Sequence, residues 1–304
     1  MRVGPNFPPA LAIAPSAPGA CVAGGEPWRS DSAADIETYG IAGRIWCVLT
    51  DREAAFLLLG YLVHSPPAPF NPPCSVYASR ATIVELGAGV GTAGLAVAAQ
   101  LGPGSTVVLT DLDEVCPLLE RNAAALGNPS RAAVRALPWG DHSAAQRVTA
   151  EFGPITHVLC SDLVYFPELL APLLRSLLDL TEHGTQEVIV GYKIRSLVKE
   201  QPFWLAFGTW FEFEPVDVLH AGKEWIPYGS RTSHVLAGGG DDAPAEDDYF
   251  VFVAHRRRST LGDAPPRSDA ELLLGRRIRD GQLVDADVGA DTFELLLLGR
   301  SMPL

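Results

Sequence analysis

Three closely spaced glycines between a strand-like run and a helix-like run constrain the fold of this chain most strongly. Residues 82–86 are typical of a buried strand, and residues 92–101 have the apolar spacing of a helix. Gly87, Gly89 and Gly91 lie between them. Because glycine has no β-carbon, the backbone can turn tightly here and approach a ligand closely. A helix that begins directly after such a turn offers free N–H groups to an anionic group.

The spacing of these glycines narrows the class of ligand. A dinucleotide-binding loop has the pattern G-x-G-x-x-G, whose third glycine would fall at Thr92. A P-loop is excluded because no Gly-Lys-Ser/Thr follows. Asp111 ends the next apolar run, where its carboxylate can accept both hydroxyls of a ribose. The residues alone leave two alternatives open, a tight turn without a ligand and a helix N-cap at Asp111.

Strand-like and helix-like segments alternate along the middle of the chain. Further strands are expected at 106–110, 133–137, 156–161 and 187–191, and helices at 113–126, 169–180 and 196–211. Two final strands, 213–219 and 249–254, have no helix between them, so we expect them to pair antiparallel. The predicted fold class is α/β: a Rossmann-like, seven-stranded, mostly parallel sheet with an antiparallel last strand and helices on both faces.

The two ends of the chain differ from this alternating region. Residues 1–30 are rich in Pro, Gly, Ala and Ser, which predicts a disordered tail. Residues 31–258 are expected to form one domain with a flexible, Gly- and Asp-rich insertion at 234–248. Residues 259–304 form a C-terminal extension of unknown role that either packs on the domain or hangs free. Within it, short helices are predicted after the capping-box residue Ser268 and over 292–298.

Composition excludes several kinds of partner. The formal net charge is −13, from 36 acidic and 23 basic residues, which disfavours a nucleic acid and suits a basic protein segment. No apolar run reaches the roughly 18 residues of a membrane-spanning helix, so no membrane contact is expected. The five cysteines form no C-x-x-C pair, which indicates reduced thiols and no metal site. We therefore expect a cytoplasmic protein, with the nucleus as a second location.

Short motifs follow one another in a characteristic order between residues 40 and 216. They are Gly43-Arg44-Ile45-Trp46, the loop from Glu85 to Gly91, Leu109-Thr110-Asp111, Asn122, Leu137-Pro138-Trp139-Gly140, Ser161-Asp162-Leu163-Val164-Tyr165 and Gly191-Tyr192-Lys193-Ile194-Arg195. In this order they resemble the class I S-adenosylmethionine-dependent methyltransferases and, more narrowly, the protein-lysine methyltransferases of methyltransferase family 16. The chain departs from the family's Trp-Asp-Ala-Ala, because Cys47 follows Trp46, and it has Ser161 in place of a usual alanine.

The resemblance implies S-adenosylmethionine as the cofactor and a protein lysine as the methyl acceptor. It places these residues around the cofactor: Trp46, Glu85, Gly87, Ala88, Gly89, Gly91, Asp111, Trp139 and Ser161. It makes Asp162 and Tyr165 the catalytic residues. Asp162 would accept hydrogen bonds from the lysine ε-amine, and Tyr165 would form an aromatic wall or donate a hydrogen bond.

Other interpretations of these residues remain open. Without the resemblance, Asp162 is equally a turn cap, and Tyr165 and the two tryptophans are equally core. Lys193 and Arg195 are either solvated surface or substrate contacts. Methylation of a small molecule or of another side chain, and a non-catalytic binding module with the same fold, are the alternative functions.

Overall fold

The computed structural model describes residues 36–41, 44–49, 53–63, 69–125, 131–220, 222–229, 249–286 and 288–301. The predicted N-terminal tail (1–30) and the whole of the predicted insertion (234–248) lie outside these residues.

A seven-stranded sheet forms the centre of the molecule, in the order β6-β5-β4-β7-β8-β12-β9. Its strands are β4 (Thr82–Leu86), β5 (Thr106–Asp111), β6 (Ala132–Ala136), β7 (His157–Ser161), β8 (Glu187–Lys193), β9 (Phe211–Pro215) and β12 (Tyr249–Arg256). The strands from β6 to β8 pair in parallel, and β12 lies antiparallel between β8 and β9. The predicted fold class is therefore confirmed, including the antiparallel pairing of the last two strands.

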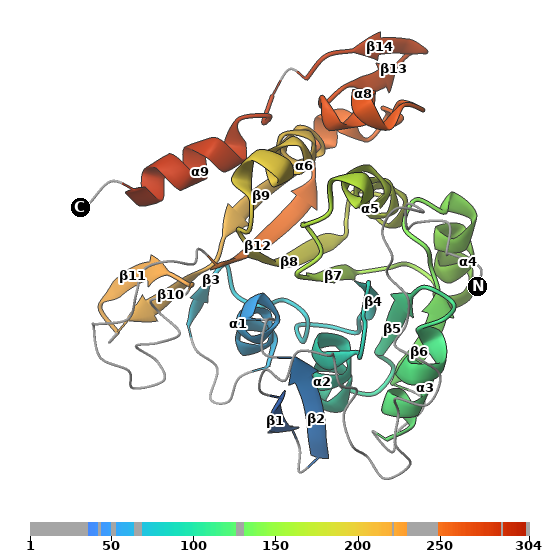
Figure 1. Cartoon of the computed structure of the whole chain (residues 1–304), viewed down its shortest axis with the longest axis vertical. Helices are drawn as coiled ribbons and strands as arrows, with labels where there is room; N and C mark the ends of the chain where they lie inside the picture. Colours follow the sequence, from blue (N-terminus) through green and yellow to red (C-terminus); the bar gives the residue numbers. More distant parts are fainter. Residues whose placement is uncertain are drawn as a thin grey trace.

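Helices cover both faces of this sheet (Figure 1). One face carries α1 (Glu53–Leu62), α2 (Thr92–Gln100) and α3 (Cys116–Ala124), and the other carries α4 (His142–Phe152), α5 (Pro167–Leu180) and α6 (Leu197–Trp210). Successive side chains of each strand point to opposite faces, so Ile83 joins the core beneath α1 and α2, whereas Val84 joins the core beneath α5. Strands buried on both faces explain the continuous apolar runs in the sequence.

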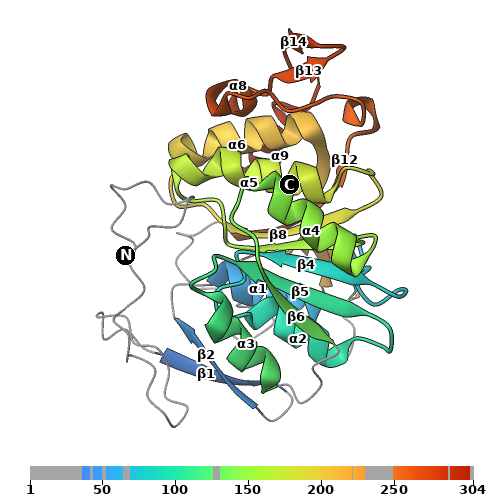
Figure 2. The same cartoon turned by 90° about the vertical axis from the view of Figure 1, so that its right-hand side faces the viewer.

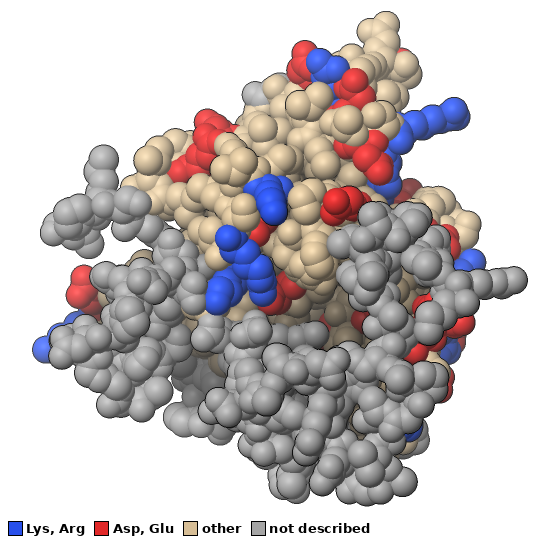
Figure 3. Space-filling model, viewed as in Figure 1, with Lys and Arg blue, Asp and Glu red and all other residues tan. Residues whose placement is uncertain are grey.

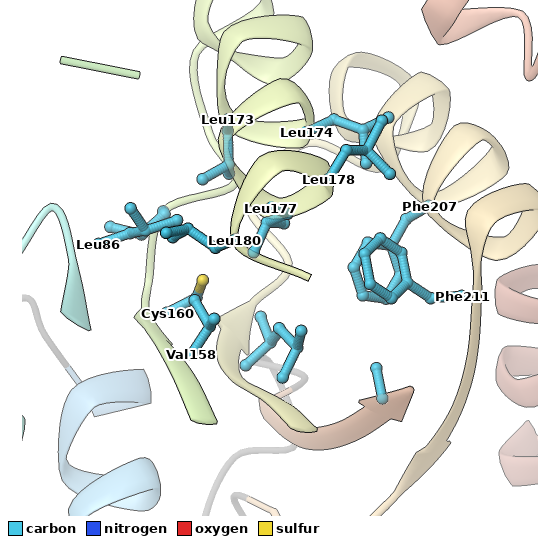
Figure 4. Packing of buried hydrophobic residues seen from close by; sticks show 14 of the residues in the cluster. Leu86, Val158, Cys160, Leu173, Leu174, Leu177, Leu178, Leu180, Phe207 and Phe211 are labelled. Carbon is cyan, nitrogen blue, oxygen red and sulfur yellow. The ribbon is translucent and has the colours of Figure 1, made fainter. Parts of the chain in front are cut away.

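Helix α5 shows how the sequence pattern produces this packing. Its buried leucines, which recur every three or four residues, include Leu173, Leu174, Leu177 and Leu178. They form one apolar stripe that faces the sheet and the rings of Phe207 in α6 and Phe211 in β9 (Figure 4).

Three elements differ from the sequence prediction. Helix α4 was not predicted, although Asp141 caps it by accepting a hydrogen bond from the Ala144 N–H at 3.0 Å. The predicted strand 213–219 is divided at Pro215, which has no N–H for further pairing. Its second half, β10 (Asp217–His220), pairs instead with β11 (Glu224–Pro227) and β3 (Phe70–Asn71). The segment before α1 forms an unpredicted hairpin of β1 (Ile36–Ile41) and β2 (Arg44–Leu49).

The C-terminal extension packs on the outer side of α5 and α6 (Figure 2). It comprises η1 (Arg258–Thr260), α8 (Asp269–Leu273), β13 (Arg277–Arg279), β14 (Gln282–Val284) and α9 (Thr292–Ser301). The ring of Phe293 in α9 is 1% exposed and stacks on Trp204 of α6, with 4.8 Å between the ring centroids. Arg175 of α5 donates to Asp269 at 2.8 Å, which anchors α8.

Candidate cofactor and acceptor site

The loop between β4 and α2 has a left-handed backbone at all three glycines. The φ angles are 56° at Gly87, 57° at Gly89 and 83° at Gly91. Residues with a β-carbon rarely adopt this backbone conformation, so the shape of the loop requires glycine at these three positions. The Ala88 N–H donates to the Thr110 carbonyl at 2.9 Å, which holds the loop against the end of β5.

Glu85, the acid that precedes the loop, is buried beneath it. Its side chain is 1% exposed, and its Oε2 accepts a hydrogen bond from the Gly94 N–H of α2 at 3.0 Å. A carboxylate near the first turn of a helix is also stabilised by the helix dipole. In this structure, Glu85 therefore fixes the helix relative to the loop.

Asp111 connects the loop to the end of β5. Its Oδ2 accepts a hydrogen bond from the Gly89 N–H and its Oδ1 accepts one from the Leu112 N–H, both at 2.7 Å. Each carboxylate oxygen can accept more than one hydrogen bond, so these bonds leave acceptor capacity for ribose hydroxyls. Asn122 of α3 donates to the Val90 carbonyl at 2.8 Å and secures the far side of the loop.

Trp139 brings an aromatic wall to the same loop. The indole is close enough to Gly87 that a β-carbon on that residue would collide with it, and the same β-carbon would lie 3.0 Å from Leu163 Cδ2. The residue after the tryptophan, Gly140, has a φ of 81°, and its N–H donates to Ser176 Oγ at 2.8 Å. The turn that carries Trp139 is thus attached to α5.

Asp162 lies at the carboxyl end of β7 in an unusual backbone conformation. Its φ is 61°, and its N–H donates to the Gly191 carbonyl of β8 at 2.8 Å. Its carboxylate accepts hydrogen bonds from both terminal nitrogens of the Arg195 guanidinium, and the distance from Nη1 to Oδ1 is 2.6 Å. This ion pair raises the pKa of Arg195. The guanidinium also lies 5.7 Å from the centre of the Tyr165 ring.

The sequence did not indicate the role of Glu200, which holds the segment that carries Arg195. Its buried carboxylate accepts hydrogen bonds from the Tyr192 hydroxyl at 2.7 Å, the Ser196 N–H at 2.9 Å and the Arg195 N–H at 3.3 Å. The signal was a serine N-cap followed by an acid, but the acid stands four residues later rather than the three of a capping box.

The structure brings most of the predicted site residues to one edge of the sheet. Leu163, which follows Asp162, lies beside Gly87, so the turn after β7 adjoins the glycine loop. Ser161 ends β7 and is half-buried. Trp46 lies on β2, and its side chain is outside the described part of the structure. Among the described residues, no group of three or more His, Cys, Asp or Glu side chains has the arrangement of a metal site.

These side chains suit a nucleoside cofactor. They combine a glycine turn, an aromatic wall and a carboxylate at the end of the second parallel strand, which is where open α/β sheets bind nucleotides.

Within the described ranges, no helix has the length and apolar character needed to cross a bilayer.

Comparison with known proteins identifies the family. A model of a family described as lysine methyltransferase matches residues 32–206, which is more than half of the chain. The chain belongs to this family. The family membership confirms the predicted resemblance, and with it S-adenosylmethionine as the cofactor.

Two curated proteins are similar to this chain in sequence. The chain is 30% identical to protein N-lysine methyltransferase METTL21A of Xenopus tropicalis over 159 residues, which are 51% of this chain and 62% of that protein. It is 34% identical to protein-lysine N-methyltransferase EFM6 of Saccharomyces cerevisiae over 122 residues, which are 37% of this chain and 50% of that protein. The aligned region therefore spans less than two thirds of either relative.

Solved structures of methyltransferases show a more distant likeness. An O-methyltransferase from Bacillus cereus in complex with SAH has a TM-score of 0.39 and 14% identity, covering 69% of this chain and 83% of that chain. P. horikoshii TYW2 in complex with MeSAdo has a TM-score of 0.40 and 12% identity, covering 74% of this chain and 72% of that chain.

Proposed function

We propose that this protein transfers a methyl group from S-adenosylmethionine to the ε-amine of a lysine in a protein substrate. The observation that carries the proposal is the contact between two loops: Leu163, in the turn that begins with Asp162, lies beside Gly87 of the glycine loop. An acceptor at Asp162 would therefore adjoin a cofactor at the loop. The names of the two curated relatives support lysine as the acceptor.

Residues around the glycine loop would hold the cofactor. The backbone from Gly87 to Gly91 would lie along its amino-acid part, and Asp111 would accept the ribose hydroxyls. Trp139 would stack on the adenine, and Trp46 and Ser161 would complete the pocket. When bound, S-adenosylmethionine supplies an electrophilic methyl group on a sulfonium.

Asp162 and Tyr165 would prepare the acceptor. The lysine nitrogen must be neutral, because its lone pair forms the new N–C bond while the S–C bond breaks; the methylated nitrogen then releases a proton to solvent. Asp162 would accept a hydrogen bond from the amine and direct its lone pair. Tyr165 would form one wall beside the amine. Alignment of the two reacting atoms within about 3–3.5 Å is the main contribution that such a site makes.

We also propose that the protein works in the cytosol, with the nucleus as a second location. The cysteines Cys74, Cys116 and Cys160 are free thiols, as expected in a reducing compartment. Fractionation of cells that express a tagged chain tests this location.

The variant Asp162→Asn tests the proposed function. The purified protein is incubated with a cell lysate and radiolabelled S-adenosylmethionine, and the labelled lysine is identified by mass spectrometry. The variant is expected to lose at least 100-fold in rate while its affinity for S-adenosylmethionine, measured by calorimetry, changes less than threefold. Label on metabolites or lipids alone would favour a small-molecule acceptor instead.

Asp280→Asn is the matched control. Asp280, in the hairpin of β13 and β14, has a φ of 52° and is the other described non-glycine residue with a positive φ. The same chemical change at the same backbone conformation is therefore expected to leave methylation unchanged. Full activity of Asp162→Asn would contradict the proposed role of that carboxylate.

A further inference from the structure

The carboxylate proposed to orient the acceptor already has a cationic partner. Two nitrogens of Arg195 bind the two oxygens of Asp162. The Asp162 side chain is 8% exposed and that of Arg195 is 34% exposed, so the pair lies at the boundary between the core and the solvent. A planar guanidinium in this two-point geometry is held more firmly than a lysine ammonium would be.

The surrounding chain fixes this arginine in place. The N–H groups of Arg195 and Ser196 both donate to the buried Glu200, which also accepts from Tyr192. The guanidinium lies over the Tyr165 ring. These contacts restrain Arg195. They distinguish it from a mobile charged side chain on the solvated surface.

A lone carboxylate would be a poor partner for a methyl acceptor. A nearby negative charge stabilises the ammonium form of a lysine and raises its pKa, whereas methyl transfer requires the neutral amine. A fixed positive charge beside the same carboxylate has the opposite effect. An Asp–Arg pair is neutral overall, so it accepts a hydrogen bond without holding the acceptor in its protonated form.

We propose that Arg195 is a positioning residue that neutralises Asp162, so that the site selects the neutral form of the acceptor amine. This inference rests on the proposed lysine methylation. It assigns to Arg195 a task that an uncharged side chain of similar size cannot perform.

Among the described residues, other charged or titratable groups near this ion pair are Tyr165 from the turn after β7, Tyr192 and Lys193 from the end of β8, and Glu200 from α6. The Lys193 ammonium lies 4.9 Å from the centre of the Tyr249 ring on β12. In Figure 3, several basic side chains lie close together near the middle of the visible face, although the chain as a whole is acidic.

The pH dependence of kcat tests this assignment in three variants. Arg195→Gln removes the charge, and Arg195→Lys keeps it. Lys193→Gln removes a charge from the same strand end, where the Lys193 ammonium lies over the Tyr249 ring. In Arg195→Gln, the acidic limb of the profile is expected to move upward by about one pH unit or more. The rate then falls about tenfold at low pH and approaches the wild-type rate at high pH. Arg195→Lys and Lys193→Gln are expected to keep the limb within about 0.3 units of the wild type.

A purely structural role would give a different result. The proposal would be overturned if Arg195→Gln lowered the rate by the same factor at every pH and did not shift the acidic limb of the profile.

Binding of n-butylammonium separates this proposal from the proposed function. Calorimetry or NMR titration at pH 7 uses the full chain with S-adenosylhomocysteine and needs no methyl acceptor. Arg195→Gln is expected to bind the cation at least tenfold more tightly than the wild type, and Asp162→Asn/Arg195→Gln is expected to lose this gain. Equal binding by Arg195→Gln and the wild type would overturn the role of Arg195. Absence of methylation in any lysate would overturn the proposed function, whereas the binding of n-butylammonium tests the effect of the Arg195 charge by itself.

Discussion

The indole of Trp139 lies directly against Gly87: a β-carbon on Gly87 would come within 2.7 Å of the Cζ2 atom of that ring. The contact joins the turn after β6 to the glycine loop after β4. Because Gly87 also has a positive φ, both the backbone and the neighbouring ring require glycine at this position.

Gly87→Ala is therefore expected to weaken the binding of S-adenosylmethionine by at least tenfold, about 1.4 kcal/mol, when measured by calorimetry. Gly153→Ala is its control, since Gly153 has a φ of 82° but no atom within 4 Å of an added β-carbon. That variant carries the backbone strain without the collision, and we expect unchanged affinity. Equal losses in the two variants would show that the Trp139 contact is unimportant.

Gly94→Ala is expected to destabilise the fold. An added β-carbon would collide with the buried Glu85 carboxylate and would lie 2.5 Å from Leu109 Cδ2. Such overpacking lowers the free energy of unfolding by about 1–3 kcal/mol, which urea denaturation would measure. Gly102→Ala, where an added β-carbon meets no atom within 4 Å, is expected to be neutral or slightly stabilising. A stable Gly94→Ala variant would mean that Glu85 is free to move.

Phe293→Ala is expected to lower the free energy of unfolding by about 3–5 kcal/mol, because the ring is fully buried against Trp204. Leu298→Ala changes a residue of the same helix that is 63% exposed, and its effect should stay within about 0.5 kcal/mol. Urea denaturation compares the two variants. Similar small effects would mean that α9 contributes little to the stability of the domain.

Acid is expected to destabilise the fold through His157. Burial lowers the pKa of this residue below its usual value of 6.5, although Glu187 opposes the shift. The unfolded chain then binds the proton more readily than the folded chain, so stability decreases as the pH falls below about 6.5. One such group contributes at most about 1.4 kcal/mol per pH unit. Urea denaturation at pH 7.5 and pH 5.5 should show a smaller decrease for His157→Gln, and an equal decrease would contradict this assignment.

Much of the sheet could be predicted because its strands are short apolar runs separated by helical patterns. The strand at 82–86 and the glycine turn after it have the predicted bounds, since glycine is required by the φ angles found there. Helix α4 was missed because three small buried residues, Ala144, Ala145 and Val148, form only a narrow apolar stripe. A local sequence pattern indicates whether a residue lies in a helix, a strand or a turn. It indicates less well which residues contact it in the folded chain.

The site shows the same limit. Asp162 was recognised from its motif, but its pairing with Arg195 depends on the parallel alignment of β7 and β8, which brings positions 33 residues apart into contact. The role of Glu200 depends on the loop between β8 and α6. Neither relationship has a periodic signature in the sequence.

The insertion of β12 between β8 and β9 has a consequence for synthesis on the ribosome. The strands from β4 to β8 can pair as soon as residue 193 has emerged, but β9 is joined to the sheet by residues 249–256. Until that later segment arrives, the edges of β8 and β9 are exposed to pairing with other chains. The stage of synthesis after β9 has emerged and before β12 has emerged is therefore the one at which a chaperone would be most valuable.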